Sequence, residues 1–334
     1  MKSVLVTGGA GFIGSHTVVE LAKAGYRPVI LDDFSNSEES IIPKIESIVG
    51  SKVSTYKGNF SDRKLLANIF SGDNVKSVIH FAAFKAVGES VSYPLKYYKN
   101  NVAGMINLLE VLVEHRIYPF VFSSSCTVYG EPDKLPVTEE APTKPAVSPY
   151  GATKQMCETI LRDTCAATDL RGLSLRYFNP IGAHPSAKIG ELPLGVPANL
   201  VPFVTQTAAG LRDELTVFGN DYPTRDGTNV RDYIHVVDLA KAHIKALEYL
   251  DKQEPSFYDA INIGTGKGST VLEVIKTFEK VTGVKVSYKI GKRRPGDVIA
   301  LYAKAAKANK VLGWKAKKTL ADALADAWRW QQQG

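Results

Sequence analysis

One segment near the N-terminus, SVLVTGGAGFIG at residues 3–14, restricts the fold more than any other. An apolar run typical of a buried strand leads directly into a glycine-rich turn, and a helical pattern follows the turn. Gly9, Gly11 and Gly14 satisfy the spacing G-x-G-x-x-G; starting instead from Gly8 gives G-x-x-G-x-x-G. Such glycines permit a tight turn and let the backbone approach a pyrophosphate, which the helix N-terminus stabilises. The alternative is a glycine-rich turn that holds no ligand.

The rest of the first half repeats this strand–helix alternation. Short runs rich in β-branched residues are separated by amphipathic segments, as in a parallel sheet whose two faces are both covered. Repeated strand–helix–strand units predict an α/β fold with a doubly wound, Rossmann-type parallel sheet. The expected strands are residues 3–7, 28–31, 52–56, 76–81 and 119–124, and the expected helices are 13–24, 64–70, 95–114 and 150–167, with Pro149 just ahead of the last one or in its first turn.

The composition and periodicity of the sequence change after residue 176. Residues 179–232 are rich in Pro, Gly and Asn and have few long periodic segments, which predicts a loop-rich substrate lobe. Thr270 and Glu273 form a capping box at the start of a helical pattern. The expected elements of this half are helices at 238–250, 269–281 and 320–330 and a buried strand at 260–264.

Composition excludes several classes of protein. The 334 residues, 44% hydrophobic and 22% charged, are typical of a globular chain. No apolar run approaches the roughly 18–20 residues that span a bilayer, and glycine interrupts the N-terminus too soon for a signal peptide. The net charge of +7 is dispersed, and its densest cluster, KAKK at 315–318, lacks interleaved aromatic residues. We therefore expect neither a nucleic-acid nor a membrane partner, whereas an anionic small substrate suits this charge.

The three cysteines indicate the compartment. They have no metal-type spacing, so we expect no metal site, and an odd number makes a poor disulfide framework. This usage favours a reducing, cytoplasmic compartment.

Two acids close the second expected strand. Asp32 and Asp33 lie about twenty residues beyond the glycine turn, where a carboxylate can bond the ribose hydroxyls of a dinucleotide. Because a carboxylate repels a 2′-phosphate, the pair favours NAD over NADP.

A tyrosine and a lysine lie one helical turn apart in SPYGATK at residues 148–154. Tyr150 and Lys154 would share one helix face. A phenol titrates near pH ~10 and an ammonium near ~10.4, so neither is a strong catalyst in its ordinary state. The pair gains meaning beside a cofactor that needs a proton moved together with a hydride. The alternative is an ordinary solvated helix face.

Longer strings carry a family resemblance. The glycine turn, a serine near the end of the fifth strand and Y-x-x-x-K together resemble the extended short-chain dehydrogenase/reductases. Five further strings closely resemble the UDP-glucose 4-epimerase family within that group, and the similarity extends from residue 2 to about residue 330. These strings are KAVGES (85–90), SSSCTVYG (123–130), RYFNPIGAHPS (176–186), VFGNDYPTRDGT (217–228) and VRDYIHVVDLA (230–240).

The resemblance implies an activity and a division of the chain. In this family UDP-galactose and UDP-glucose are interconverted by oxidation at C4 with NAD, rotation of the 4-keto sugar and reduction on the other face. Residues 1–178 would bind NAD, with 235–265 returning to that part, and 179–334 would form a smaller α/β domain that binds the UDP-sugar. A homodimer would form through the helix at 95–114 and the helix that starts at Tyr150, with Leu108, Leu109, Val111 and Leu112 suiting a helix buried on more than one side.

The resemblance also assigns roles to individual residues. Tyr150 as phenolate would take the proton of the 4-hydroxyl, Lys154 and the positive nicotinamide would lower its pKa, and Ser125 would hold the same oxygen. Cofactor contacts would come from Gly8, Gly11, Phe12, Ile13, Gly14, Asp32, Asp33, Asn36, Ser37, Asn59, Phe60, Phe81, Ala82, Ala83, Lys85, Asn100, Ser123, Tyr150, Lys154 and Tyr177. Substrate contacts would come from Lys85, Ser125, Tyr150, Phe178, Asn179, Asn199, Leu200, Thr216, Val217, Phe218, Arg231, Arg294, Asp297 and Leu301.

Two positions qualify the resemblance. The family commonly has Gly-Asp after the third strand, where the acid meets the adenine amino group, but here the string is GNF with Asn59. An amide oxygen can accept the same bond without charge, which predicts weaker retention of NAD. Leu301 falls where the family closes over the sugar 2-substituent; it is intermediate in size, so N-acetylated UDP-hexoses stay open as substrates. The alternative for Leu301 is ordinary core packing.

Relatives with other activities differ at the positions directly after the serine. A sugar-nucleotide 4,6-dehydratase needs an acid pair directly after the serine, and a decarboxylase needs a glutamate there. Cys126 and Thr127 occupy those positions, which argues against both. A net NAD-dependent oxidoreductase of nucleotide sugars and a non-catalytic NAD-sensing regulator remain alternatives, although such regulators usually lack the tyrosine–lysine pair.

Overall fold

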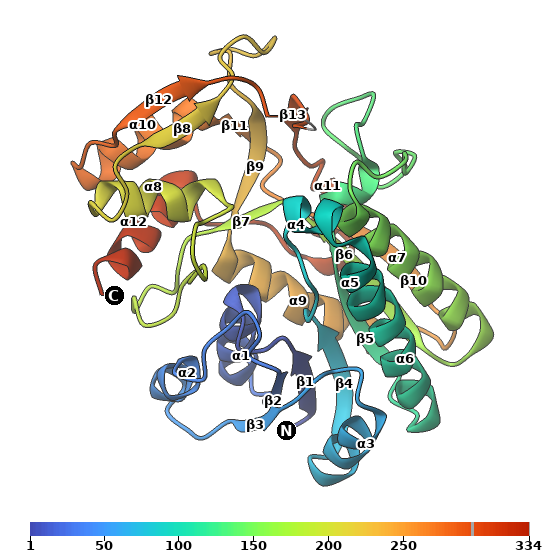
Figure 1. Cartoon of the computed structure of the whole chain (residues 1–334). Helices are drawn as coiled ribbons and strands as arrows, with labels where there is room; N and C mark the ends of the chain where they lie inside the picture. Colours follow the sequence, from blue (N-terminus) through green and yellow to red (C-terminus); the bar gives the residue numbers. More distant parts are fainter. Residues whose placement is uncertain (295–296, 334) are drawn as a thin grey trace.

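A seven-stranded parallel sheet forms the centre of the larger lobe in the computed structural model, which describes residues 1–294 and 297–333 (Figure 1). The strand order β10-β6-β5-β4-β1-β2-β3 reverses between β1 and β4, and at such a switch point open α/β sheets bind their ligands. The strands are β1 (Ser3–Thr7), β2 (Arg27–Asp32), β3 (Ser54–Lys57), β4 (Val75–His80), β5 (Pro119–Ser125), β6 (Arg171–Tyr177) and β10 (Tyr258–Ile263). The five strands expected from the sequence are confirmed.

Helices cover both faces of this sheet. On one face the apolar sides of α1 (Phe12–Lys23), α2 (Ile41–Val49) and α9 (Val236–Leu250) share a core with the sheet. On the other face α3 (Arg63–Gly72), α6 (Gly104–Glu114) and α7 (Pro149–Ala167) do the same. The apolar runs of the strands are thus buried from both sides, as their sequences predict. The short helices α4 (Val87–Ser92) and α2 were not expected from the sequence, and α11 (Ala306–Leu312) packs against α9 and β10.

The helix expected at 95–114 contains a local irregularity. The chain runs from α5 (Pro94–Tyr97) through a π-helical turn (Tyr98–Ala103) into α6. Single π-turns within helices occur frequently at functional sites. This one carries Asn100 and Asn101, next to the end of β4. The buried Asn101 amide bonds both backbone groups of Phe84, at 2.9 and 3.0 Å, and Thr153 Oγ1 on α7 at 3.2 Å.

The smaller lobe is built around a four-stranded sheet. In it, β9 (Val230–His235) pairs with β7 (Asn179–Ile181), β11 (Gly268–Thr270) and β13 (Ala300–Leu301). A separate parallel pair joins β8 (Leu215–Phe218) to β12 (Tyr288–Gly291). Three helices pack over these strands in one core: α8 (Leu200–Ala208), α10 (Val271–Thr282) and α12 (Leu320–Gln331). The capping box of Thr270 and Glu273 is present at the start of α10.

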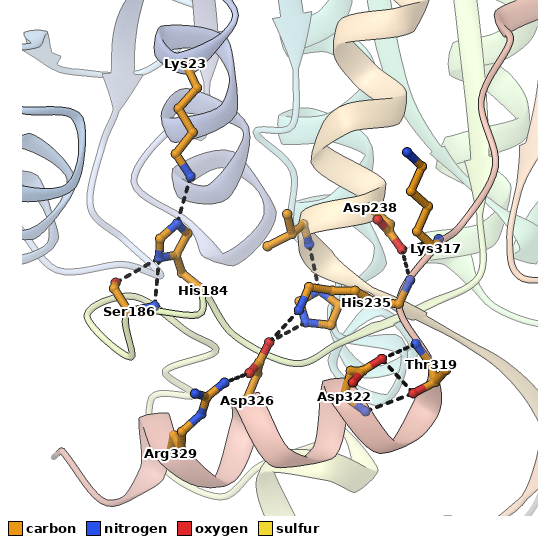
Figure 2. Close-up of polar contacts among 12 residues, drawn as sticks. Lys23, His184, Ser186, His235, Asp238, Lys317, Thr319, Asp322, Asp326 and Arg329 are labelled. Atoms are coloured by element: carbon orange, nitrogen blue, oxygen red, sulfur yellow. Dashed lines mark hydrogen bonds and ion pairs between the residues drawn. The ribbon is translucent and has the colours of Figure 1, made fainter.

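A polar network joins the two lobes beneath α1 (Figure 2). Lys23 Nζ on α1 lies 3.1 Å from His184 Nε2, on the loop after β7. His235 Nε2, at the end of β9, lies 3.0 Å from Asp326 Oδ2 on α12, and Arg329 pairs with the same carboxylate. Asp238 Oδ2 on α9 accepts the Lys317 N–H at 2.7 Å. These bonds fix α1 to the loop after β7 and the C-terminal helix to the end of β9. Among the residues described, no helix is long and apolar enough to cross a membrane.

Candidate active site

The glycine turn connects β1 to α1 at the switch point of the sheet. Gly8 has a φ of 69°, a left-handed conformation that glycine adopts without steric cost, and its N–H donates to Leu31 O at 2.8 Å. A Cβ at Gly14 would overlap the carbonyl oxygen of Gly8, so a side chain at that position would push the helix away from the turn. The turn therefore leaves the start of α1 open to a ligand, as a dinucleotide pyrophosphate requires.

Asp32 ties the turn to the loop that follows β2. Its Oδ2 accepts the Ala10 N–H at 2.9 Å, while Oδ1 accepts from Phe34 N at 3.0 Å and from Ser37 Oγ at 2.9 Å. Burial raises the pKa of this carboxyl, and the backbone hydrogen bonds from Phe34 and Ala10 oppose that shift. The carboxylate thus lies where a ribose would pass from the turn to the loop, beside the expected Asn36. This placement fits NAD, and the sequence alone did not indicate the bonds to Ala10 and Ser37.

Asn59 is engaged within its own loop. Its Oδ1 accepts both the Ser61 N–H, at 2.9 Å, and the Ser61 hydroxyl, at 2.7 Å. An amide oxygen has two acceptor positions, and Ser61 uses both. The sequence suggested that this oxygen could take the place of an aspartate oxygen toward adenine; the structure shows that a neighbouring serine already occupies it.

The expected catalytic residues come together at the carboxyl end of β5. Ser125 ends that strand, and α7 begins at Pro149 with Ser148 as its N-cap, which places Tyr150 in the first turn. Tyr150 and Lys154 are 8% and 4% exposed, so the solvated helix face considered above is excluded. Lys154 Nζ donates to Ser123 O at 2.7 Å and lies 5.9 Å from the centre of the Tyr150 ring.

Burial dominates the titration of this pair. It raises the pKa of the Tyr150 phenol, a shift that the nearby Tyr177 increases and the Ser125 hydroxyl opposes. Burial also lowers the pKa of Lys154 to about 8. The chain's own groups therefore keep the phenol protonated at neutral pH, and a further positive charge is needed to make it a base.

A buried ion pair and a hydrogen bond join α7 to β6 and β5. Glu158 follows Lys154 by one turn, and its carboxylate receives Nε and Nη2 of Arg176 from β6, at 3.0 and 2.6 Å. Ser124 Oγ donates to the same carboxylate at 2.6 Å. This network was not predicted from the sequence. The signal for it was that Glu158 follows Tyr150 and Lys154 at intervals of four residues, and so lies on the same helix face. The network fixes the helix face that carries the tyrosine and lysine against β5 and β6.

The expected substrate residues form two groups in the smaller lobe. In the first, Asp297 Oδ1 receives Nη2 of Arg294 at 2.7 Å and lies 3.7 Å from Nη2 of Arg231. The Arg294 guanidinium lies 5.6 Å from the centre of the Phe218 ring. Val217 is 1% exposed, so at that position only the backbone can serve a ligand, whereas Phe218 is 43% exposed. These residues would surround an anionic nucleotide with two forked donors.

The second group includes residues packed beside the end of β5. Phe178 and Leu301 are buried in one apolar cluster with Cys126, directly after Ser125. Asn199 precedes α8, whose first residue is Leu200, and its side chain bonds Glu191. Asn179 begins β7, beside β9. The structure thus places the expected contacts at the carboxyl end of β5 in the large sheet and on the loops and strands of the smaller lobe.

Comparison with known proteins identifies the family. The UDP-glucose 4-epimerase of Bacillus subtilis is 51% identical over 98% of this chain and 96% of its own length. That of Dictyostelium discoideum is 51% identical over 98% and 95%. A crystal structure of UDP-glucose-4-epimerase from Stenotrophomonas maltophila with bound NAD and formylated UDP-arabinopyranose superposes with a TM-score of 0.97 at 47% identity, covering 100% of this chain and 98% of the other. The chain belongs to the UDP-glucose 4-epimerase family.

A second comparison points to the wider group. A family model described as GDP-mannose 4,6 dehydratase matches residues 5–327. An epimerase and a dehydratase can share this scaffold, but the residues after Ser125 separate them. Burial raises the pKa of the Cys126 thiol to about 12, and Thr127 carries only a hydroxyl. Neither is an acid suited to eliminating water, so this epimerase-family chain shares the dehydratase model's scaffold without the acid pair.

Proposed function

We infer that the chain interconverts UDP-galactose and UDP-glucose with NAD as its cofactor. The observation that carries this inference is the buried set of Ser125, Tyr150 and Lys154 at the carboxyl end of β5. Strand β1, which leads into the glycine turn, belongs to the same parallel sheet. Membership of the epimerase family supports the same conclusion, as does the structure of the Bifidobacterium longum UDP-glucose 4-epimerase, in complex with NAD⁺ and UDP. That enzyme has a TM-score of 0.95 at 47% identity and covers 99% of this chain and 98% of its own.

The side chains divide the work of the reaction. Bound NAD supplies reversible hydride acceptance at C4 of the sugar and a positive charge. Tyr150 takes the proton of the 4-hydroxyl and later returns it, while Ser125 holds the same oxygen by a hydrogen bond. Lys154, fixed to Ser123 O, adds positive charge near the phenol. Because the site is buried, these charges act through little water and are stronger than at a surface.

The proposed nucleotide-binding residues lie in the smaller lobe. Arg231, Arg294 and Asp297 lie together and suit the uridine diphosphate, since a guanidinium presents paired donors to phosphate oxygens. Asn179, Asn199, Leu200 and the backbone of 216–218 would complete the nucleotide site. We assign residues 1–178 and 235–265 to the NAD-binding part and the rest of 179–334 to the UDP-sugar part. UDP-N-acetylhexosamines remain the second candidate substrates, since Leu301 is of intermediate size.

Three buried, unpaired thiols support a reducing compartment, and we propose that the protein is cytoplasmic. Fractionation of the producing cells tests this. Protein recovered with an oxidising compartment would contradict it.

Turnover of UDP-galactose tests the function. The purified protein should convert UDP-galactose to UDP-glucose without net formation of NADH, because the hydride leaves and returns within one turnover. Steady accumulation of NADH in solution would indicate a net dehydrogenase instead. Bound NAD with no turnover of any UDP-sugar would indicate a regulator.

A homodimer is the second part of the proposal. The four apolar residues that suit a helix buried on more than one side are almost fully buried in the chain's own core: Leu108, Leu109, Val111 and Leu112. The outer surface of α6 and α7 nevertheless carries Ile106 and Met156, which are 39% and 45% exposed. Ile106 lines a groove with Val113 of α6 and Ile160 of α7. We propose that two copies bury this surface against each other.

Solution mass tests the dimer. At micromolar concentration, sedimentation should give twice the chain mass, and Ile106→Glu should give a folded monomer because a charge cannot be buried there without a partner. Val281→Glu is the matched control: Val281 is 38% exposed on α10, away from this surface, and its replacement should leave the dimer intact. A monomeric parent protein would refute the proposal.

A further inference from the structure

Glu191 lies on the loop between β7 and α8, and that loop is firmly anchored. The loop closes on itself through the His184 N–H, which donates to Ile189 O at 3.0 Å. Trp330 Nε1 on α12 donates to the carbonyl of Glu191 at 3.2 Å. A Cβ at Gly190 would overlap the Trp330 ring, so glycine is what allows the loop to approach the C-terminal helix so closely. The backbone at Glu191 is therefore positioned by α12.

The side chain of Glu191 points to two residues that the proposed function places at the substrate. Its Oε1 accepts from Asn199 Nδ2 at 2.6 Å and lies 3.8 Å from Lys85 Nζ. Lys85 belongs to the loop after β4, in the large lobe, whereas Asn199 precedes α8 in the small lobe. One carboxylate oxygen thus connects a loop of the large lobe to a loop of the small lobe.

The exposed fractions of the two side chains show that Glu191, and not Lys85, is the fixed partner of this ion pair. The Glu191 side chain is 11% exposed and the Lys85 side chain is 54% exposed. Burial raises the pKa of Glu191, and the charge of Lys85 and the bond from Asn199 oppose that shift. A long, exposed lysine has many rotamers, and holding it in place beforehand lowers the entropy lost when a ligand binds.

We propose that Glu191 is a positioning residue, which holds the Lys85 ammonium and the Asn199 amide ready for the UDP-sugar. This inference rests on the proposed function, which makes Asn199 a nucleotide contact, and on the family resemblance, which makes Lys85 a contact of both cofactor and substrate. The two partners give Glu191 two separable effects. Its oxygen accepts a hydrogen bond from Asn199, and its negative charge attracts the Lys85 ammonium.

Two replacements of Glu191 separate these effects. Glu191→Ala removes both contacts and should raise KM for UDP-galactose about 3- to 10-fold, the factor expected for one or two hydrogen bonds, with kcat within about 2-fold of the parent. Calorimetry should show a loss of UDP affinity of similar size. Glu191→Gln keeps an oxygen for Asn199, so UDP should bind as it does to the parent, while KM for UDP-galactose still rises about 2- to 3-fold.

Coupled variants identify the partner. If Glu191 acts through Lys85, adding Glu191→Gln to Lys85→Met should raise KM no further than Lys85→Met alone. Glu279→Gln is the matched control, since Glu279 also pairs with a lysine, Lys285 at 3.0 Å, and accepts a backbone N–H, from Val286 at 3.1 Å, but lies on α10. This control should change neither KM nor UDP affinity.

Three results would overturn the inference. The first is parent-like KM and UDP affinity in Glu191→Ala. The second is full additivity of Glu191→Gln with Lys85→Met. The third is an equal loss of UDP affinity in Glu191→Gln and Glu191→Ala. If the parent fails to convert UDP-galactose, the proposed function fails, but UDP affinity still reports on Glu191 and Asn199.

Discussion

The Lys154 ammonium is bonded to the Ser123 carbonyl oxygen, 2.7 Å away, and not to the phenol of Tyr150. The bond runs from α7 to β5 and fixes the lysine at 5.9 Å from the centre of the tyrosine ring. At that distance the lysine stabilises a phenolate by its field rather than by a direct hydrogen bond. Lys154 and Ser125 thus act on the tyrosine from two different elements, and each can be removed without moving the other.

Removing the phenol tests the base. Tyr150→Phe keeps the buried ring but removes the proton acceptor, and we expect kcat to fall about 10²- to 10⁴-fold, the usual contribution of a positioned acid or base. Thermal unfolding and NAD binding should remain near those of the parent. Turnover within a few fold of the parent would exclude Tyr150 from this role.

Removing the lysine tests the field. In Lys154→Met the phenol loses a nearby positive charge, so its pKa rises further and the plot of kcat against pH should shift to more alkaline values. In the parent, the lysine has a pKa lowered to about 8 by burial, so above that pH the ammonium deprotonates and this assistance declines. A Lys154→Met profile that is lower at every pH but unshifted would mean that the lysine serves only to position the cofactor.

The Asn59 loop tests cofactor retention. Because Ser61 occupies both acceptor positions of the Asn59 oxygen, Asn59→Asp adds a second oxygen that is free to accept from the adenine amino group. We expect NAD to bind roughly 10- to 150-fold more tightly, as for one added hydrogen bond to a charged acceptor. Ser61→Ala is the companion variant, because it frees part of the existing oxygen. Unchanged NAD dissociation in both proteins would rule out this account of position 59.

Leu301 tests the choice of hexose. It lies in the apolar cluster with Phe178 and Cys126, so both readings from the sequence, a gate or core packing, predict a buried side chain. If it closes over the sugar, UDP-galactose should be preferred to UDP-N-acetylgalactosamine by roughly 10- to 200-fold, and Leu301→Cys should narrow that ratio. Equal preference in the parent, or a lower Tm with no gain for the N-acetyl sugar, would favour plain packing.

Local sequence patterns predicted much of the fold but less of the candidate site. The glycine turn is a local signature, and β1, β2, β4 and β5 were predictable because each is a short, mostly apolar run covered on both sides. The edge strand β3 is only half-buried and was marked by its β-branched residues. The β8–β12 pair was not predictable, since its two short strands are far apart in sequence and only tertiary structure aligns them. The π-turn at 98–103 contains no glycine or proline to mark it. Glu191 was missed for the same physical reason as β12: its partners Lys85 and Asn199 come from separate loops.

The place of β10 in the sheet has a consequence for synthesis of the chain. This strand, residues 258–263, closes the sheet beside β6, and α9 just before it covers one face of β5 and β6. On the ribosome, domains usually fold in order from the N-terminus. Here the nucleotide-binding half cannot finish until the strand after α9 has emerged, so a nascent chain stalled before residue 258 should expose the edge of β6 and remain sensitive to protease.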